Sequence, residues 1–223
     1  MVGKYSHHLR QVLQEHYEIL EYWKGSKFAV IEMEWNYSPI HNNRTFCLFI
    51  KGYIERILTQ FGHKRPTKTQ LFPHKNSVIC YGSKVQEDPK EVTSPSLDAT
   101  GIKYVQSIVL EVLFYGLAVE KKILVELNAI VTQQATATES TNEAINHLLD
   151  YLATYPNDGI IYRSRSMVLA AHSYAGFHNK SKGCSQFGSH IFLAENEPVP
   201  RWNGPILTIS QVIKTFMYSA AEA

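Results

Sequence analysis

The segment MVLAAHSYAGF, residues 167–177, holds the side chains with the clearest potential for chemistry. A run of mostly small and apolar residues leads into His172, Ser173 and Tyr174, and a small, glycine-containing step follows. This pattern predicts a strand that ends at a flexible turn, which is a common place for a catalytic side chain. Because adjacent strand residues point to opposite faces, His172 and Ser173 cannot form the hydrogen bond that a serine nucleophile needs. The segment therefore predicts no Ser–His pair.

Clustered carboxylates, which bind divalent metals, are missing from the same part of the sequence. Magnesium prefers hard oxygen ligands, and two-metal sites hold their ions with Asp and Glu. From Gly159 to Ala194 the sequence contains neither residue type. This stretch is basic, and so is a shorter one near Pro66. Each of the two has two interpretations, a contact with a phosphate backbone or an ordinary solvated surface. The candidate nucleic-acid-binding residues are Lys64, Arg65, Lys68, Arg163, Arg165, Lys180 and Lys182.

Trp23, Trp35 and Trp202 carry the largest aromatic faces of the chain. Exposed aromatic side chains can stack on nucleic-acid bases. Buried ones contribute large apolar surfaces to packing. We expect these three to pack in the core or in a hairpin, and base stacking is the alternative.

Composition limits the classes of protein to consider. The 223 residues are 44% hydrophobic and carry a net charge of only +2, so the chain is globular and has no strong overall field toward nucleic acid or membrane. Three widely spaced cysteines, Cys47, Cys80 and Cys184, indicate neither a disulfide framework nor a zinc site. The N-terminus lacks the apolar region of a signal peptide, and the most apolar stretch, Ile108–Val119, is too short to span a bilayer. We expect an intracellular protein of the cytoplasm or nucleus.

Hydrophobic periodicity predicts the N-terminal elements. Residues 6–23 have apolar positions at helical spacing. Residues 28–35 and 44–50 are β-prone runs around a polar loop, which predicts a hairpin. Residues 53–61 form a second amphipathic pattern with Gly62 as its cap, and residues 63–100 read as a long, proline-rich connection.

The second half of the chain changes from helical to β-prone character. Residues 102–134 predict two helices that part near Glu120–Lys122. Ser140 and Glu143 form a capping-box pattern ahead of a further helix. Short β-prone runs follow Gly159, so we place a domain boundary near Asp158. Residues 206–218 fit both a strand and a helix, and pattern counting alone favours helix.

Four segments in order resemble copia-type retrotransposon polyproteins. KGYIERILTQFG is similar to the segment after the palm of their reverse transcriptases, and YVQSIVLEVLFYGLAV resembles their thumb helix. AINHLLDYLATYPNDGIIY resembles a later helix and strand. MVLAAHSYAGF, SQFGSHIFL, PVPRW and SAAEA resemble the start of the attached RNase H domain. By this resemblance, residues 212–218 are a strand and a helix begins near Ser219.

The resemblance implies an α+β fold with an N-terminal helix and β-hairpin, a helical thumb-like region and a partial RNase H-like sheet. Residues 1–52 would be the end of a palm-like region, residues 53–158 a thumb-like and connecting region, and residues 159–223 the N-terminal half of an RNase H-like domain.

Both activities of the resembled family use two magnesium ions held by carboxylates. The sequence has no Asp-Asp pair for the polymerase site, and Tyr174 replaces the first RNase H aspartate. A neutral phenol is a poor magnesium ligand. Glu222 lies one residue before the end of the chain, where the family pattern continues to a second Glu. Tyr174 and Glu222 are therefore vestigial positions.

The resemblance thus predicts a catalytically silent fragment of a reverse transcriptase and ribonuclease H, without a cofactor of its own. The alternative is a non-catalytic module that binds nucleic acid, such as an RNA–DNA hybrid, or another protein. No membrane partner is expected.

Overall fold

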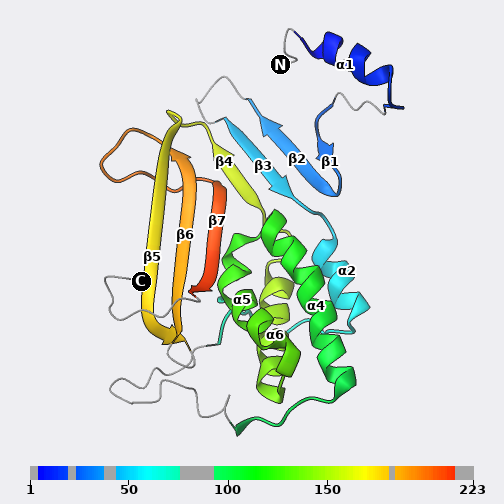
Figure 1. Ribbon diagram of the computed structural model, residues 1–223, viewed down its shortest axis with the longest axis vertical. Helices are drawn as coiled ribbons and strands as arrows, with labels where there is room; N and C mark the ends of the chain where they lie inside the picture. Colours follow the sequence, from blue (N-terminus) through cyan, green and yellow to red (C-terminus); the bar gives the residue numbers. More distant parts are fainter. Residues whose placement is uncertain (1–4, 20–23, 38–43, 76–92, 181–183, 214–223) are drawn as a thin grey trace.

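A computed structural model describes residues 5–19, 24–37, 44–75, 93–180 and 184–213. The fold is α+β, with two antiparallel sheets and a layer of packed helices. Figure 1 shows the first sheet above the helices and the second sheet beside them. The N-terminal helix α1, Ser6–Gln14, stands apart from both.

The first sheet contains the predicted hairpin and one strand from much later in the chain. Its strands are β1 (Lys27–Phe28), β2 (Ile31–Asn36), β3 (Thr45–Phe49) and β4 (Ile160–Arg163), in that order. The antiparallel pairing of β2 with β3 confirms the hairpin. β4 lies beyond the boundary that the sequence suggested near Asp158, yet it pairs with β3. Gly159 permits this approach, because a Cβ there would lie 2.3 Å from the carbonyl oxygen of Leu48.

The helical layer contains most of the buried side chains. It consists of α2 (Tyr53–Gln60), α4 (Ala99–Ala118), the 3-10 turn η1 (Lys121–Ile123), α5 (Leu124–Gln133), the 3-10 turn η2 (Gln134–Thr136) and α6 (Glu139–Thr154). The predicted break near Glu120–Lys122 is confirmed. Gly62 has φ +64°, so it ends α2 in the left-handed conformation expected of a glycine cap. The core includes Ile54, Ile57, Val105, Ile108, Val112, Tyr115, Leu127, Ile145, Leu148, Leu149 and Leu152.

Two helix boundaries differ from the sequence prediction. α1 ends at Gln14, well before residue 23, and none of its residues is buried. A short helix that buries none of its residues is only marginally stable, which explains the early end. α6 begins one residue before Ser140, because Thr138 and Thr141 form the capping box through reciprocal side-chain and backbone hydrogen bonds. Ser140 instead donates its backbone N–H to Ser94 Oγ.

The second sheet is a three-stranded meander of β5 (Val168–Lys180), β6 (Cys184–Ala194) and β7 (Pro205–Ile213). The prediction that a strand ends near Tyr174 is wrong. β6 continues beside β5, so Tyr174 pairs with Gly188 in mid-strand and the glycine-containing step remains extended. The helical interpretation that pattern counting favoured is also wrong for Pro205–Ile213, because pairing with β6 overrides the local pattern. Of the strand predicted at 212–218, Val212 and Ile213 lie in β7, which confirms this part, and residues 214–218 and the helix near Ser219 lie outside the described residues.

The connection after α2 is fixed along α6 over Phe61–Lys75. His63 Nε2 lies 2.8 Å from Asp150 Oδ1, and the backbone N–H of Gln70 donates to Thr154 Oγ1 at 3.2 Å. Two further contacts join Phe72 O to His147 Nε2 and Lys75 Nζ to Glu143 Oε2. We call this segment the α6 strap.

Candidate nucleic-acid interface

A row of aromatic rings crosses three strands of the first sheet. Trp35 lies opposite Phe46, and Phe46 lies opposite Tyr162, so the three side chains share one face of β2, β3 and β4. The ring centroids of Trp35 and Phe46 are 3.9 Å apart, and those of Phe46 and Tyr162 are 5.8 Å apart. Tyr37 stacks on Trp35 at 5.8 Å, and Trp35 Nε1 donates to the carbonyl oxygen of Gly25. The row therefore stabilises the hairpin, as the sequence suggested for Trp35.

These rings form one wall of a cleft of about 690 Å³ between the two sheets. The opposite wall comes from Met167, just before β5, from Leu193 near the end of β6 and from Ile206 near the start of β7. Trp35 is 48% exposed and Tyr37 is 62% exposed, so both remain accessible. We call this site the aromatic cleft, and its lining includes Trp35, Tyr37, Arg44, Phe46, Leu48, Tyr162, Arg163, Arg165, Met167, Leu193, Asn203 and Ile206.

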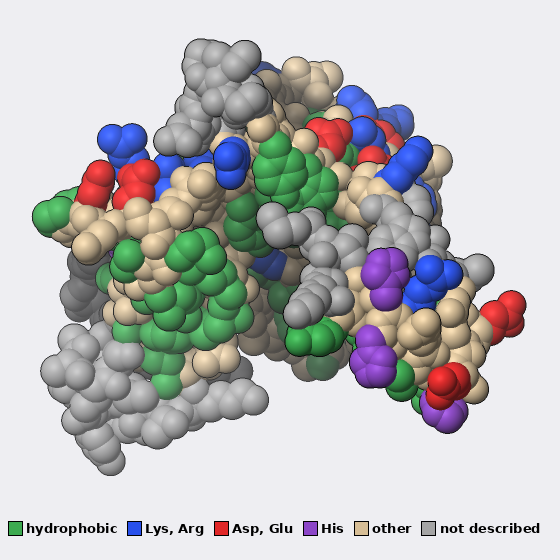
Figure 2. Space-filling model, turned by 90° about the horizontal axis from the view of Figure 1, so that it is seen from above, with side chains coloured by type: hydrophobic (Ala, Val, Ile, Leu, Met, Phe, Trp, Pro, Cys, Tyr) green, Lys and Arg blue, Asp and Glu red, His purple; other side chains and the backbone are tan. Residues whose placement is uncertain are grey.

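The charged residues that line the aromatic cleft are all arginines. Arg44 and Arg163 are exposed, and no Asp or Glu is among the lining residues. Arg165 is mostly buried and donates from Nη1 to Glu195 Oε1 at 3.0 Å. Its Nε has no hydrogen-bond partner among the described residues. Figure 2 shows hydrophobic side chains exposed near lysine and arginine side chains on one face of the molecule.

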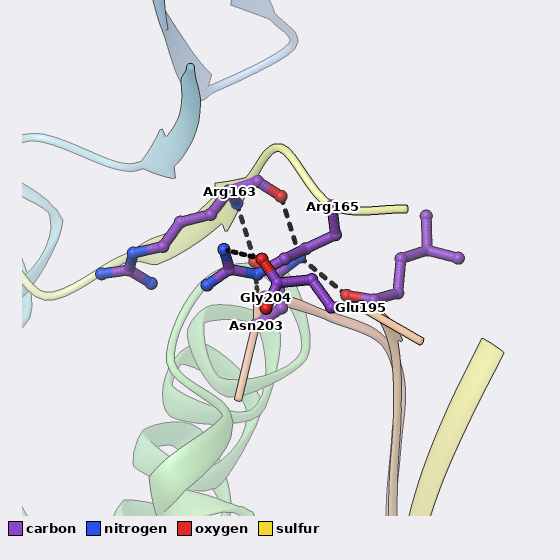
Figure 3. Close-up of polar contacts among 6 residues, drawn as sticks. Arg163, Arg165, Glu195, Asn203 and Gly204 are labelled. Atoms are coloured by element: carbon purple, nitrogen blue, oxygen red, sulfur yellow. Dashed lines mark hydrogen bonds and ion pairs between the residues drawn. The ribbon is translucent and has the colours of Figure 1, made fainter. Parts of the chain in front are cut away.

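Asn203 fixes the arginines relative to the second sheet. Its Oδ1 accepts hydrogen bonds from the backbone N–H groups of Arg163 and Gly204, at 2.7 and 3.0 Å. Its Nδ2 donates to the carbonyl oxygens of Arg163 and Leu193, at 3.0 and 2.9 Å. Figure 3 shows this amide between β4 and the end of β6, with the Arg165–Glu195 ion pair beside it. One buried side chain therefore joins the two sheets at the cleft.

The aromatic cleft combines features that suit a polyanion with planar groups. Guanidinium groups bind phosphate through paired hydrogen bonds, and aromatic surfaces contact bases without strong sequence preference. Burial raises the pKa of Tyr162, so its hydroxyl stays neutral and donates to the carbonyl oxygen of Pro205. The lining thus offers cationic groups for phosphate and aromatic surfaces for planar rings.

Tyr174, which the resemblance predicts to be a vestigial position, lines a second cavity of about 410 Å³, between the second sheet and α5. Tyr174 is 73% exposed. His172 and His190 face each other across β5 and β6, and the Trp202 ring lies 4.5 and 4.9 Å from theirs. Burial lowers the pKa of His190, and nearby His172 adds to this, while a hydrogen bond to Asn203 opposes it. None of the lining residues is acidic.

A buried carboxylate lies in a third cavity, of about 280 Å³, where α4 meets β4 and the β6–β7 connection. Glu120 is 1% exposed, and its Oε2 has no hydrogen-bond partner among the described residues. Burial raises the pKa of Glu120 to about 7; the Lys122 ammonium opposes the shift and the Asp158 carboxylate adds to it. Lys122 also pairs with Asp158 at 2.5 Å. Across the described residues, no group of three or more His, Cys, Asp or Glu side chains could hold a metal ion.

The structure brings together only part of the predicted basic set. Arg163 and Arg165 line the aromatic cleft. Lys64, Arg65 and Lys68 are exposed on the α6 strap and do not line the cleft, and Arg65 lies 3.6 Å from Glu55. Lys180 ends β5, and its side chain is not described. Lys182, Glu222 and Trp23 lie outside the described residues.

Sequence reasoning missed several residues of the aromatic cleft. Arg44 precedes β3 and was not singled out, and Asn203 carries no recognisable motif. Phe46 and Tyr162 are far apart in the sequence and meet only because β4 pairs with β3. A repeated aromatic–basic pattern at Phe46 and Arg44, and again at Tyr162 and Arg163, was the available signal.

No family model, no curated protein and no solved structure matches the chain. One described helix, α4, is long and apolar enough to cross a membrane by length and composition alone. Core helices of soluble proteins meet the same criterion, and α4 supplies the buried Val105, Ile108 and Val112. The helix is thus weak evidence for a membrane span.

Proposed function

We propose that the chain is a catalytically silent derivative of a copia-type reverse transcriptase and ribonuclease H that binds nucleic acid through the aromatic cleft. The observation that carries the binding role is the set of three arginines around exposed aromatic rings, without an acidic side chain in the lining. An RNA–DNA hybrid is the proposed ligand, in the cytoplasm or nucleus.

Two features support descent from this family. The four resembling segments occur in the family's order, and the hairpin leads directly into α2 as the strand-to-helix motif KGYIERILTQFG requires. The later helix and strand of the family correspond to α6 and β4, and the beginning of its RNase H domain corresponds to the meander of β5, β6 and β7. An RNase H-like relationship of this meander is part of the proposal.

Binding is tested by fluorescence anisotropy with a labelled RNA–DNA hybrid at increasing salt. Affinity should fall as salt rises, because phosphate contacts release counterions. Arg44→Ala and Arg163→Ala should each weaken binding and reduce the salt slope by about one. Lys103→Ala, on the exposed face of α4, is the matched control and should leave binding unchanged.

The same titration distinguishes the aromatic cleft from the α6 strap. If Lys64→Ala weakens binding while Arg163→Ala does not, the thumb-like region binds the ligand and the cleft proposal is wrong. Binding whose affinity does not change with salt would argue against phosphate contacts at both the aromatic cleft and the α6 strap.

Catalytic silence is tested separately, with magnesium or manganese and an end-labelled hybrid. We expect the RNA strand to remain intact, because Tyr174 offers a neutral phenol where the resembled family has a carboxylate. Cleavage that a chelator abolishes would overturn this part of the proposal and leave the binding role intact.

A further inference from the structure

The edge of the second sheet formed by β5 has no partner among the described residues. The sheet order is β5-β6-β7, so β5 pairs with β6 on one side only. At the opposite edge, β7 lies beside α5 in Figure 1. Every second residue of an unpaired edge presents backbone N–H and C=O groups that can pair with another strand.

Over Val168–Gly176 this edge lacks the features that usually prevent edge pairing, and the register shift and the lysine of β5 come only after Gly176. Lys, Pro and bulges commonly protect edge strands. When His172 is counted as neutral, Val168–Gly176 contains no charged residue, and it contains no proline. Its register with β6 is regular up to Gly176. Leu169 is 67% exposed and Tyr174 is 73% exposed, and Ala171 and Ser173 are also exposed.

We propose that β5 pairs antiparallel with β5 of a second copy of this chain, so that the two meanders form one continuous sheet across a two-fold axis. An antiparallel pair of identical strands is self-complementary, since each donor on one copy meets the equivalent acceptor on the other. Because both copies use the same edge, the contact closes at two subunits. Pairing through the uncharged segment Val168–Gly176 brings no like charges opposite each other across the axis.

The exposed apolar side chains favour this partner over a charged one. Leu169 and Ala171 occupy one face with Leu207 on the same sheet, and all three are exposed. In the dimer these side chains gain cross-strand neighbours from the second copy, which adds apolar contact to the backbone pairing. The inference stands apart from nucleic-acid binding, because the aromatic cleft uses the first sheet and the far ends of the strands.

Sedimentation of the full chain over a range of protein concentrations tests the dimer. Wild-type protein should move from monomer to dimer and show no larger species. Ala171→Lys should weaken association by about tenfold, because each copy would bring a positive charge onto the same face of the paired strands. Gln211→Lys places the same charge on the same face of β7 and should associate like wild type. A monomer at every concentration, or equal weakening by both substitutions, would overturn the proposal.

A cysteine scan tests the register without relying on loss of association. Each residue from Val168 to Ala175 is replaced in turn by Cys, with Cys47, Cys80 and Cys184 changed to Ser. In a two-fold antiparallel pair only the residue at the axis faces its own copy, within disulfide distance. Oxidation should therefore cross-link one position strongly and its neighbours weakly. Absent cross-linking, or equal cross-linking at every position from Val168 to Ala175, contradicts paired β5 strands.

Discussion

The helical layer and the second sheet differ in where their apolar side chains lie. The main core is built from α2, α4, α5 and α6 with adjoining segments, and it contains none of the described side chains of β5, β6 or β7. Among the described side chains of the second sheet, the buried apolar ones are Phe192, Ala194 and Pro205, whereas Leu169, Leu207 and Tyr174 are exposed. The meander is therefore held mainly by its hydrogen-bond ladder, by the rings around Trp202 and by Asn203.

Because of this difference, the residues that stabilise the fold lie mostly in the helices, and the surfaces that could bind a ligand lie on the sheets. A strand that packs on both faces has no surface left for a ligand, whereas a strand with an open face or edge can bind one. The aromatic cleft and the β5 edge both lie on the sheets, and the helices below them supply most of the apolar burial. Substitutions should consequently divide into those that unfold the chain and those that change binding.

The largest expected effect contrasts Leu149→Ala with Leu169→Ala. Leu149 is fully buried in the helical core, so its truncation should lower the free energy of unfolding by about 3 kcal/mol. Leu169 is 67% exposed, and its truncation should cost less than about 0.5 kcal/mol. Guanidinium unfolding followed by circular dichroism measures both. Equal costs would show that the second sheet is buried as deeply as the helical layer.

Asn203→Ala tests whether one amide joins the two regions. The substitution leaves the backbone groups of Arg163, Gly204 and Leu193 without their partner, and we expect a loss of about 2 kcal/mol. Asn196→Ala, at an exposed bend, is the control and should change little. Hydrogen exchange should show faster exchange in β4 and at the end of β6. Uniform exchange in the variant would contradict a local junction.

Local patterns were sufficient to predict the hairpin, α2 and the break between α4 and α5. Each depends on periodicity or on a cap that lies within the segment, such as Gly62 after α2. The capping box of α6 was misplaced because Thr138 and Ser140 are equally suitable caps by residue type. The choice depends on Ser94, which is distant in sequence and bonds the Ser140 backbone.

Pairing between distant segments could not be predicted in the same way. β4 joins the first sheet although helices separate it from β3, and this pairing creates the aromatic cleft. β5 extends past Tyr174 because β6 offers a partner on the far side of the glycine-containing step. Arg163 and Arg165 were identified by charge alone, but their aromatic surroundings depend on the tertiary fold.

Glu120 makes the contact between the two regions sensitive to pH. Burial raises its pKa from 4.5 to about 7, so the folded chain holds the proton more tightly than the unfolded chain. The free energy of unfolding should therefore fall by about 2 kcal/mol as the pH rises from 4.5 through 7. Glu120→Gln should abolish most of this dependence, whereas Glu197→Gln, at an exposed site, should retain it. An unchanged pH profile in Glu120→Gln would assign the dependence to another group.

The smallest expected effects concern the α6 strap, which belongs to the helical layer but is held by polar contacts. Thr154→Val removes the acceptor of the Gln70 backbone N–H, and should cost about 1 kcal/mol because that donor is partly buried. Lys75→Ala removes an exposed ion pair with Glu143 and should cost less than about 0.5 kcal/mol. Limited proteolysis within Phe61–Lys75 should therefore accelerate in Thr154→Val alone. Equal acceleration in both variants would mean that the exposed ion pair fixes the α6 strap as much as the partly buried hydrogen bond does. The strap would then be held on α6 by surface contacts, much as the second sheet is held without a large apolar core.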